Sequence, residues 1–192
     1  MTPAPSARLT PDVLMRLPVL EDAAPLARAY QRSRDHLRPW EPDRHESFFT
    51  PAGQTERLQG LLAEWSAGRA VPWVLVRQPD EDAAEPDVVG AVTLSGITRG
   101  PMCSASLGYW IDAGQVGRGL ASAAVRAVCA LSDTELGLHR LQAGTLLHNV
   151  ASQRVLTKCG FTLFGTAERY LHINGAWRDH RLFQKILNDR RP

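Results

Sequence analysis

The spacing of apolar residues alternates between a period of two, typical of strands, and a period near 3.6, typical of helices. The period-two segments predict seven strands, at residues 9–17, 71–77, 88–94, 105–111, 141–147, 161–164 and 181–187. The helical segments predict four helices, at residues 23–38, 51–68, 119–136 and 150–158. This order indicates an α/β or α+β domain whose first half is mostly antiparallel.

Local signals set several of these boundaries. Asp22 is placed to cap the first helix, and Thr50 followed by Pro51 is a typical helix start. Gly160 is expected to end the last helix. One side of the second helix is apolar and is expected to face the core, through Leu58, Leu61, Leu62 and Trp65.

Length and composition fit one domain over residues 9–192, preceded by a disordered lead-in at residues 1–8. Of the 192 residues, 44% are hydrophobic and 22% are charged, which is ordinary for a globular protein. A formal net charge of +2 without a basic run argues against direct nucleic-acid binding. Neither a signal peptide nor an apolar run of the ~20 residues needed to span a membrane is visible.

The cysteines bear on location and on metal binding. Cys103, Cys129 and Cys159 form no C-x-x-C pair, so the sequence suggests neither a disulfide framework nor a zinc site. No histidine spacing suggests another metal. We therefore expect no metal and a reducing, cytoplasmic location.

Two glycines lie between the 105–111 strand and the following helix, in the segment Gly117-Arg118-Gly119-Leu120-Ala121. Glycine lets the backbone turn tightly and approach a ligand, and the first amides of a helix attract a pyrophosphate. Arg118 either adds positive charge there or points into solvent. The glycines can also serve only to turn the chain, and their spacing matches neither a dinucleotide-binding fingerprint nor a Walker loop.

Together with the order of elements, this loop resembles the GNAT N-acetyltransferase superfamily, whose phosphate motif is Q/R-x-x-G-x-G/A. Gly119 and Ala121 fit the motif, whereas Val116 replaces the preferred Gln or Arg. A second landmark, from Asn149 through Ser152 to Gly160-Phe161, resembles the N-x-x-S…GF signature of the ribosomal-protein acetyltransferases. Taken alone, that landmark also fits an ordinary helix that is capped by its asparagine and closed by its glycine.

Two further segments narrow the resemblance to the RimJ- and RimL-like branch. Residues 38–47 (RPWEPDRHES) are similar to its W-E-P-x-R-x-E-S segment, and residues 170–180 (YLHINGAWRDH) are similar to Y-L-x-I-x-G-x-W-x-D-H. The resemblance runs from about Leu9 to Ile186. It implies a mixed, mostly antiparallel sheet of about seven strands, splayed between the fourth and fifth, with about four flanking helices.

The resemblance implies acetyl-CoA as cosubstrate, with its pantetheine arm in the splay between residues 107–111 and 141–147. The cofactor-binding residues that it implies are Tyr109, Trp110, Ile111, Val116, Gly117, Arg118, Gly119, Leu120, Ala121, Ser122 and Asn149. The acceptor amine would attack the thioester directly in a ternary complex. Because an α-amino group has a pKa near 8, this attack needs little base strength at pH 7.

The same resemblance implies a role for two polar residues. Ser152 would protonate the departing CoA sulfur, and Glu46 would be the general base and attract the cationic amine. Trp40 and Trp110 are expected to wall the acceptor pocket because flat rings bury much area and can face a cation, although RimJ lacks a tryptophan at the place of Trp110. The alternatives are a first-turn serine bonded to the backbone, a surface glutamate in a loop and a core tryptophan. Asp179 and His180 either orient catalytic waters or make a structural hydrogen bond.

The favoured function is acetylation of the N-terminal α-amine of a protein, possibly a ribosomal one. Small-molecule N-acetylation, of an antibiotic or polyamine, and non-catalytic acyl-CoA binding are the alternatives, because one fold hosts all three. The acidic segment from Asp80 to Asp87 would favour a basic ribosomal partner, or is only a solvated hairpin tip. Either a monomer or a homodimer is expected.

Overall fold

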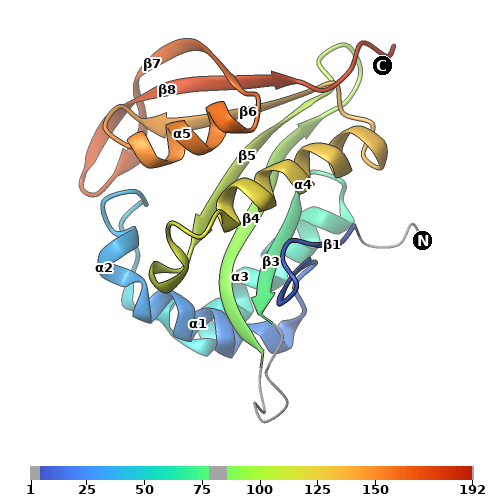
Figure 1. Ribbon diagram of the computed structural model, residues 1–192. Coiled ribbons are helices and arrows are strands. Elements are labelled where there is room, and N and C mark those ends of the chain that lie inside the picture. Colours follow the sequence, from blue (N-terminus) through green and yellow to red (C-terminus); the bar gives the residue numbers. More distant parts are fainter. Residues whose placement is uncertain (1–4, 78–85, 192) are drawn as a thin grey trace.

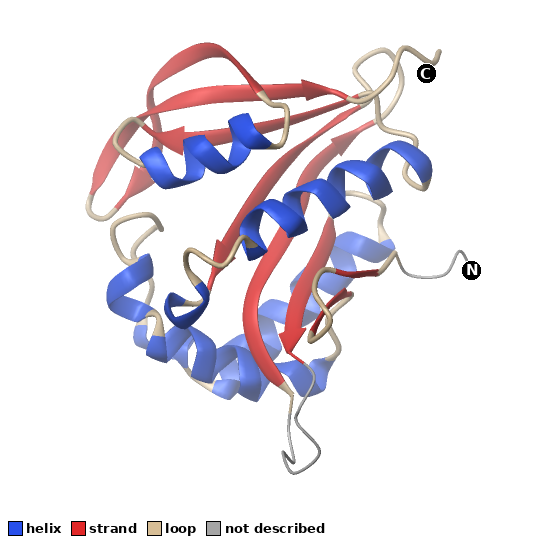
Figure 2. Cartoon of the chain, in the orientation of Figure 1, coloured by secondary structure: helices blue, strands red, loops and turns tan. Residues whose placement is uncertain are grey.

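The computed structural model describes residues 5–77 and 86–191. One mixed sheet, ordered β1-β2-β3-β4-β5-β6-β8-β7, runs through the molecule with helices on both faces (Figures 1 and 2). Its strands are β1 (Ala7–Arg8), β2 (Val13–Arg16), β3 (Val71–Arg77), β4 (Asp87–Thr98), β5 (Ser104–Ile111), β6 (Arg140–Leu146), β7 (Thr162–Ile173) and β8 (Ala176–Ile186). The α-helices are α1 (Ala23–Arg32), α2 (Arg34–Leu37), α3 (Pro51–Ser66), α4 (Leu120–Thr134) and α5 (Val150–Lys158), and the 3-10 helices are η1 (Leu20–Asp22), η2 (Glu46–Phe49) and η3 (Ala113–Gln115).

The sheet separates two hydrophobic clusters, and β3 contributes to both. Val71, Trp73 and Leu75 belong to the cluster under α4 and α5, whereas Val74 and Val76 belong to the cluster under α1 and α3. All five side chains are at most 5% exposed. A strand covered on both faces reads as a continuous apolar run, which explains the unbroken hydrophobic sequence of β3.

The pairing of β5 with β6 is short and is the feature that positions the site. All other neighbouring strands pair antiparallel, whereas β5 and β6 are parallel. Their pairing is limited to three residues of each strand, Ser104–Ser106 of β5 with Arg140–Gln142 of β6. Beyond Ser106 the two strands diverge, while β5 stays paired with β4 as far as Ile111. The splay that the resemblance implies is therefore present.

Most predicted elements are confirmed, and the C-terminal hairpin is the largest difference. The two short strands predicted at 161–164 and 181–187 belong to a long hairpin formed by β7 and β8. Most of β7 is exposed, so it lacks the alternation by which strands are recognised. Its turn, Asn174-Gly175, has positive φ at both residues, a combination typical of tight hairpins.

Two predictions near the N-terminus are wrong. Residues 5–8 are not a disordered lead-in, because Ala7 and Arg8 pair with β2 and the Pro5 carbonyl accepts a 2.8 Å hydrogen bond from Trp73 Nε1. Asp22 does not cap α1 through its side chain. It is 1% exposed and instead accepts hydrogen bonds from Arg16, at 2.7 and 2.8 Å.

The helix predicted over 23–38 is interrupted at Ser33 and forms α1 and α2, whereas the other helices begin and end within two residues of the predicted positions. Thr50 Oγ1 accepts from Gly53 N at 3.1 Å, so the predicted start of α3 is confirmed. The apolar side of α3 buries Leu58 completely but leaves Leu61, Leu62 and Trp65 half-buried. Most of the acidic segment between β3 and β4 lies outside the described residues. Within the described ranges, no helix is long and apolar enough to cross a membrane.

Candidate active site

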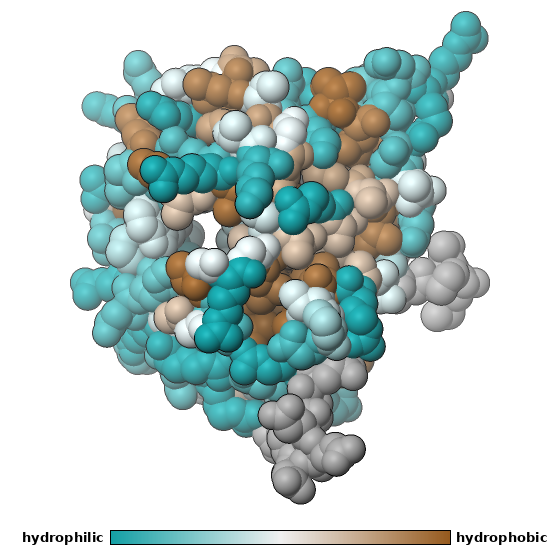
Figure 3. Space-filling model, viewed as in Figure 1, coloured by the Kyte–Doolittle hydropathy of each residue, from teal (hydrophilic) through white to brown (hydrophobic). Residues whose placement is uncertain are grey.

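The divergence of β5 from β6 opens a gap in the middle of the sheet. Figure 3 shows the molecule hollowed there, between α5 and the segment that leads into α4. Past Ser106, the edge of β5 that faces β6 carries backbone N–H and C=O groups without a strand partner. An extended chain with amide groups can bond to such an edge as another strand would.

The glycine segment lies at the mouth of this gap and leads directly into α4. Gly117 has φ 81° and Gly119, the residue before the first turn of α4, has φ 80°. A Cβ at either position would meet nothing within 4 Å, so these glycines are needed for their backbone conformation and not for space. Val116 is 54% exposed and apolar, so its side chain adds no polar group to the loop, which leaves the backbone, the start of α4 and the exposed Arg118 to hold an anion.

A buried carboxylate fixes the entrance to this loop. Asp112 directly follows β5 and is 5% exposed. It accepts hydrogen bonds from Arg32 Nε at 2.6 Å, Ser33 Oγ at 2.9 Å and Gly114 N at 3.0 Å. The end of α1 is thereby tied to the loop that precedes α4. No local pattern in the sequence indicates this contact, because Arg32 and Asp112 are 80 positions apart.

Ser152 lies on α5 and is held from two directions. Its backbone N–H donates to Asn149 Oδ1 at 3.0 Å, so Asn149 caps the helix. Its hydroxyl oxygen lies 2.8 Å from the hydroxyl of Tyr109 on β5. Burial raises the pKa of Tyr109 to about 12, against the opposing effect of the bond to Ser152. Tyr109 is among the cofactor-binding residues that the resemblance implies, but nothing in the sequence indicates this contact of its side chain.

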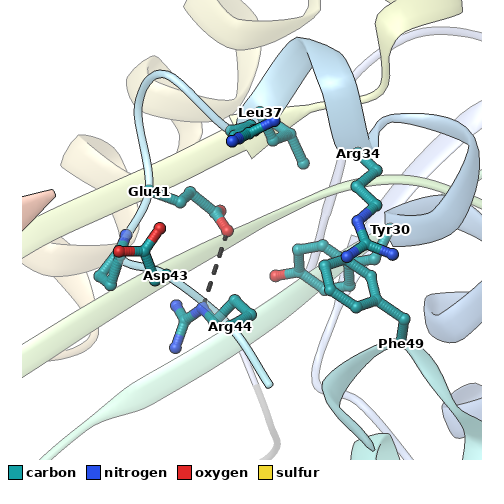
Figure 4. A pocket seen from close by; sticks show the side chains of 9 residues that line it. Tyr30, Arg34, Leu37, Glu41, Asp43, Arg44 and Phe49 are labelled. Atoms are coloured by element: carbon teal, nitrogen blue, oxygen red, sulfur yellow. Dashed lines mark ion pairs between the residues drawn. The ribbon is translucent and has the colours of Figure 1, made fainter. Parts of the chain in front are cut away.

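A pocket of about 310 Å³ lies on the other face of the sheet, beside α1 and α2 (Figure 4). Charged side chains dominate it, and Tyr30 and Phe49 supply the aromatic surface. The Arg34 guanidinium lies over the Phe49 ring, 4.3 Å from its centroid. The lining residues are Tyr30, Arg34, Leu37, Arg38, Glu41, Pro42, Asp43, Arg44 and Phe49.

Glu46, the predicted base, lies beside this pocket and is not among the residues that line it. It is exposed and forms a two-point ion pair with Arg34, in which Arg34 NH1 donates to Oε2 at 3.0 Å. This hydrogen bond lowers the pKa of Glu46 below its ordinary value. A carboxylate so stabilised in its charged form is a weaker proton acceptor.

Glu41 lines the pocket and has the opposite electrostatic character. Burial raises the pKa of this carboxyl group, and the nearby Arg44 and Arg57 cations oppose that rise. Arg44 Nε is 3.9 Å from the Glu41 carboxylate, an ion pair drawn in Figure 4. Glu41 is thus the better placed of the two carboxylates to take a proton. Glu41 stands in the W-E-P segment, but nothing in the sequence indicates that this glutamate is half-buried.

The two tryptophans predicted as pocket walls do not line the pocket, and they lie in different places. The Trp40 ring packs against His148, with centroids 5.3 Å apart, and so joins the pocket loop to the segment between β6 and α5. Trp110 is 9% exposed and belongs to the cluster under α1 and α3. Its ring centroid is 4.4 Å from that of Tyr30, which does line the pocket. Trp110 therefore supports the pocket from below.

Asp179 and His180 make structural hydrogen bonds. Asp179 Oδ1 accepts from Arg169 N at 2.9 Å, and Arg169 has a φ of 49° at an irregularity in the β7–β8 pairing. His180 Nδ1 donates to the Arg178 carbonyl at 2.9 Å. Among the described residues, no group of three or more histidine, cysteine, aspartate or glutamate side chains is arranged to hold a metal ion.

Comparison with known proteins agrees with this geometry. Residues 12–162 match the model of the acetyltransferase (GNAT) domain. The chain is 35% identical over 189 residues to the ribosomal protein uS5-alanine N-acetyltransferase of Escherichia coli, covering 98% of this chain and 95% of that one.

Two solved structures are similar over most of the chain. The ribosomal-protein-S5-alanine acetyltransferase of Vibrio fischeri superposes with a TM-score of 0.89 at 36% identity, covering 97% of this chain and 99% of that one. Mycobacterium smegmatis RimJ, solved in complex with CoA-disulfide, superposes with a TM-score of 0.84 at 32% identity, covering 91% and 81%.

Proposed function

Because the chain belongs to the GNAT acetyltransferase family, we propose that it transfers the acetyl group of acetyl-CoA to the N-terminal α-amine of a protein, of the ribosomal type. The observation that carries the acyl-CoA part is the gap between β5 and β6 with a positive-φ glycine loop at its mouth. The relative named a uS5-alanine N-acetyltransferase, similar over 98% of this chain, supports the choice of acceptor.

On the cofactor side, backbone groups do most of the binding. The amides at Gly117, Gly119 and the start of α4 would hold the pyrophosphate, and the free edge of β5 would hold the pantetheine arm. Tyr109, Trp110 and Ile111 belong to that edge. Asn149 uses its carbonyl oxygen to cap α5, and its amide N–H groups are the part that suits a pantetheine carbonyl.

On the acceptor side, we assign the pocket beside α1 and α2 to the incoming amine. Glu41 attracts the ammonium form and takes its proton, directly or through water, so that the neutral amine attacks the thioester carbonyl. The family resemblance implies Glu46 for this role instead, and the activities of the Glu41→Gln and Glu46→Gln variants distinguish the two candidates. Ser152 donates a proton to the sulfur as the C–S bond breaks. We further propose a cytoplasmic protein, monomeric or homodimeric.

The test is a panel of acceptors, read by release of the CoA thiol. It contains a peptide copying the N-terminus of ribosomal protein uS5, the same peptide with its α-amine blocked, an aminoglycoside and a polyamine. Turnover with the free peptide and none with the blocked one is expected. Turnover with only the small amines would replace the proposed acceptor. Acetyl-CoA binding by calorimetry without any turnover would instead indicate a non-catalytic acyl-CoA-binding protein.

A further inference from the structure

The hydrogen bond between Tyr109 and Ser152 joins β5 to α5, beyond the point where β5 and β6 stop pairing. Tyr109 lies on β5, three residues beyond the last residue paired with β6, and Ser152 lies in the first turn of α5. Their hydroxyl oxygens are 2.8 Å apart. The side chain of Tyr109 and the cap at Asn149 therefore fix Ser152 from opposite sides of the gap.

The direction of this hydrogen bond decides what Ser152 can do. A serine hydroxyl has one hydrogen to donate and two lone pairs to accept with. Burial raises the pKa of Tyr109 to about 12, so Tyr109 keeps its proton through the working range and is able to donate. Its contact with the Ser152 carbonyl is longer, at 3.4 Å, than its 2.8 Å contact with the Ser152 hydroxyl. When Tyr109 donates to Oγ, the hydrogen of Ser152 is free for another acceptor.

We propose that Tyr109 is a positioning residue for the acetyl transfer, acting through Ser152 by donating to its hydroxyl and leaving the Ser152 hydrogen directed at the CoA sulfur. The proposal rests on the function proposed above for Ser152. Donating to Oγ also polarises the Ser152 O–H bond, because hydrogen bonds in a chain strengthen one another. The sequence motif contains Asn149 and Ser152 but gives no sign of Tyr109, since the contact exists only in the folded chain.

The proton balance follows from this arrangement. The amine nitrogen forms a bond to the carbonyl carbon, the C–S bond breaks, and its electron pair goes to sulfur. Sulfur receives a proton from Ser152, which recovers one from Tyr109, and Tyr109 recovers one from water. The nitrogen gives up one proton to the base and then to water. Counted from the neutral amine, the net result is the N-acetylated peptide and CoA thiol, with one proton moved from nitrogen to sulfur; the proton that the ammonium form loses beforehand goes through the base to water.

The experiment is a double-mutant cycle of Tyr109→Phe and Ser152→Ala, with kcat measured at saturating acetyl-CoA and peptide. We expect kcat to fall about hundredfold in Ser152→Ala, the lower end of the range for loss of a general acid. In Tyr109→Phe we expect a smaller fall, about tenfold, because the general acid is still present but less well positioned. In the Ser152→Ala background, Tyr109→Phe should have no further effect, because it acts only through that hydroxyl. CoA affinity by calorimetry should stay unchanged in Tyr109→Phe.

A second measurement separates positioning from a packing role. With the selenoester analogue of acetyl-CoA, the leaving selenolate is a weaker base and needs less help from a proton donor. The ratio of wild-type to Tyr109→Phe kcat should then approach one. Additive effects in the cycle, or an unchanged ratio with the selenoester, would overturn the inference. Wild-type kcat in Ser152→Ala would instead remove the proposed role of Ser152 itself.

Discussion

At the β5–β6 gap, the two faces of the sheet present different kinds of chemical group. Under α4 and α5, the site consists of glycine backbone and the neutral hydroxyls of Tyr109 and Ser152. Under α1 and α2, it consists of charged side chains around the pocket that Glu41 lines. The first face suits a cofactor that is the same in every reaction, and the second, with three arginines and the carboxylates of Glu41 and Asp43, suits an acceptor that is recognised through charged groups.

This difference also decides how each face depends on the rest of the protein. A backbone site needs only the right φ angles and the start of a helix, which a few consecutive residues supply. A side-chain site needs partners brought together by the fold, such as Arg34 with Glu46 or Arg44 with Glu41. Substitutions in the glycine loop of the first face should therefore change acetyl-CoA binding alone, and substitutions of the charged groups on the second face should change acceptor turnover alone.

The largest expected effect is that of Gly119→Val. Its φ of 80° strains a side chain by roughly 1–2 kcal/mol, and more for a β-branched residue. We expect the KM for acetyl-CoA to rise about hundredfold while the KM for the peptide stays within about twofold. Gly60→Val is the matched control, because Gly60 lies in α3 without a positive φ and with open space around it. An equal rise in the two KM values would contradict the separation of the faces.

Asp112→Ala should break the connection between the two faces. The Asp112 side chain is 7% exposed and its partner Arg32 is 40% exposed, so removing the carboxylate should lower the free energy of unfolding by about 2 kcal/mol. Both KM values should rise, since Asp112 holds the end of α1 and the glycine loop together. Chemical denaturation and steady-state kinetics measure the two effects.

Glu64→Ala is the control for this variant, because the Glu64–Arg69 pair is exposed on both sides. It should leave stability and both KM values nearly unchanged. If Asp112→Ala raised only the KM for acetyl-CoA, Asp112 would serve the cofactor loop alone, and the two faces would be independent.

The sequence predicts the backbone parts of the site better than the side-chain contacts, because only the former depend on consecutive residues. The glycine loop and α5 follow from local patterns, the splay of the strands follows from the resemblance to the GNAT superfamily, and the structure has these elements at nearly the predicted boundaries. The Tyr109–Ser152, Asp112–Arg32 and Arg34–Glu46 contacts join residues 43, 80 and 12 positions apart, and no periodicity encodes them. Glu46 stood out in a motif, but the partner that changes its pKa lies on α2.

The smallest expected effect distinguishes the two carboxylates of the acceptor face. Glu41→Gln should lower kcat/KM for the peptide about tenfold, because it removes the proposed base but keeps the shape of the pocket. Glu46→Gln should change kcat/KM less than about twofold, because Arg34 already holds Glu46 in its charged form. Acetyl-CoA binding by calorimetry should be unchanged in both variants, which separates them from Gly119→Val.

The pH dependence of kcat/KM also distinguishes Glu41 from Glu46 as the base. The base works only when deprotonated, and burial raises the pKa of Glu41, so its deprotonated fraction falls at a higher pH than that of an ordinary carboxyl group. Once Glu41 has passed the ammonium proton to water, the reacting state holds a neutral amine and a free carboxylate, so the α-amine, with a pKa near 8, contributes a slope of one to log kcat/KM at lower pH. In wild type this slope should steepen to two below the raised pKa of Glu41, and it should stay at one in Glu41→Gln. Steepening that persists in Glu41→Gln and disappears in Glu46→Gln would make Glu46 the base after all, and would place proton transfer at the rim of the pocket instead of inside it.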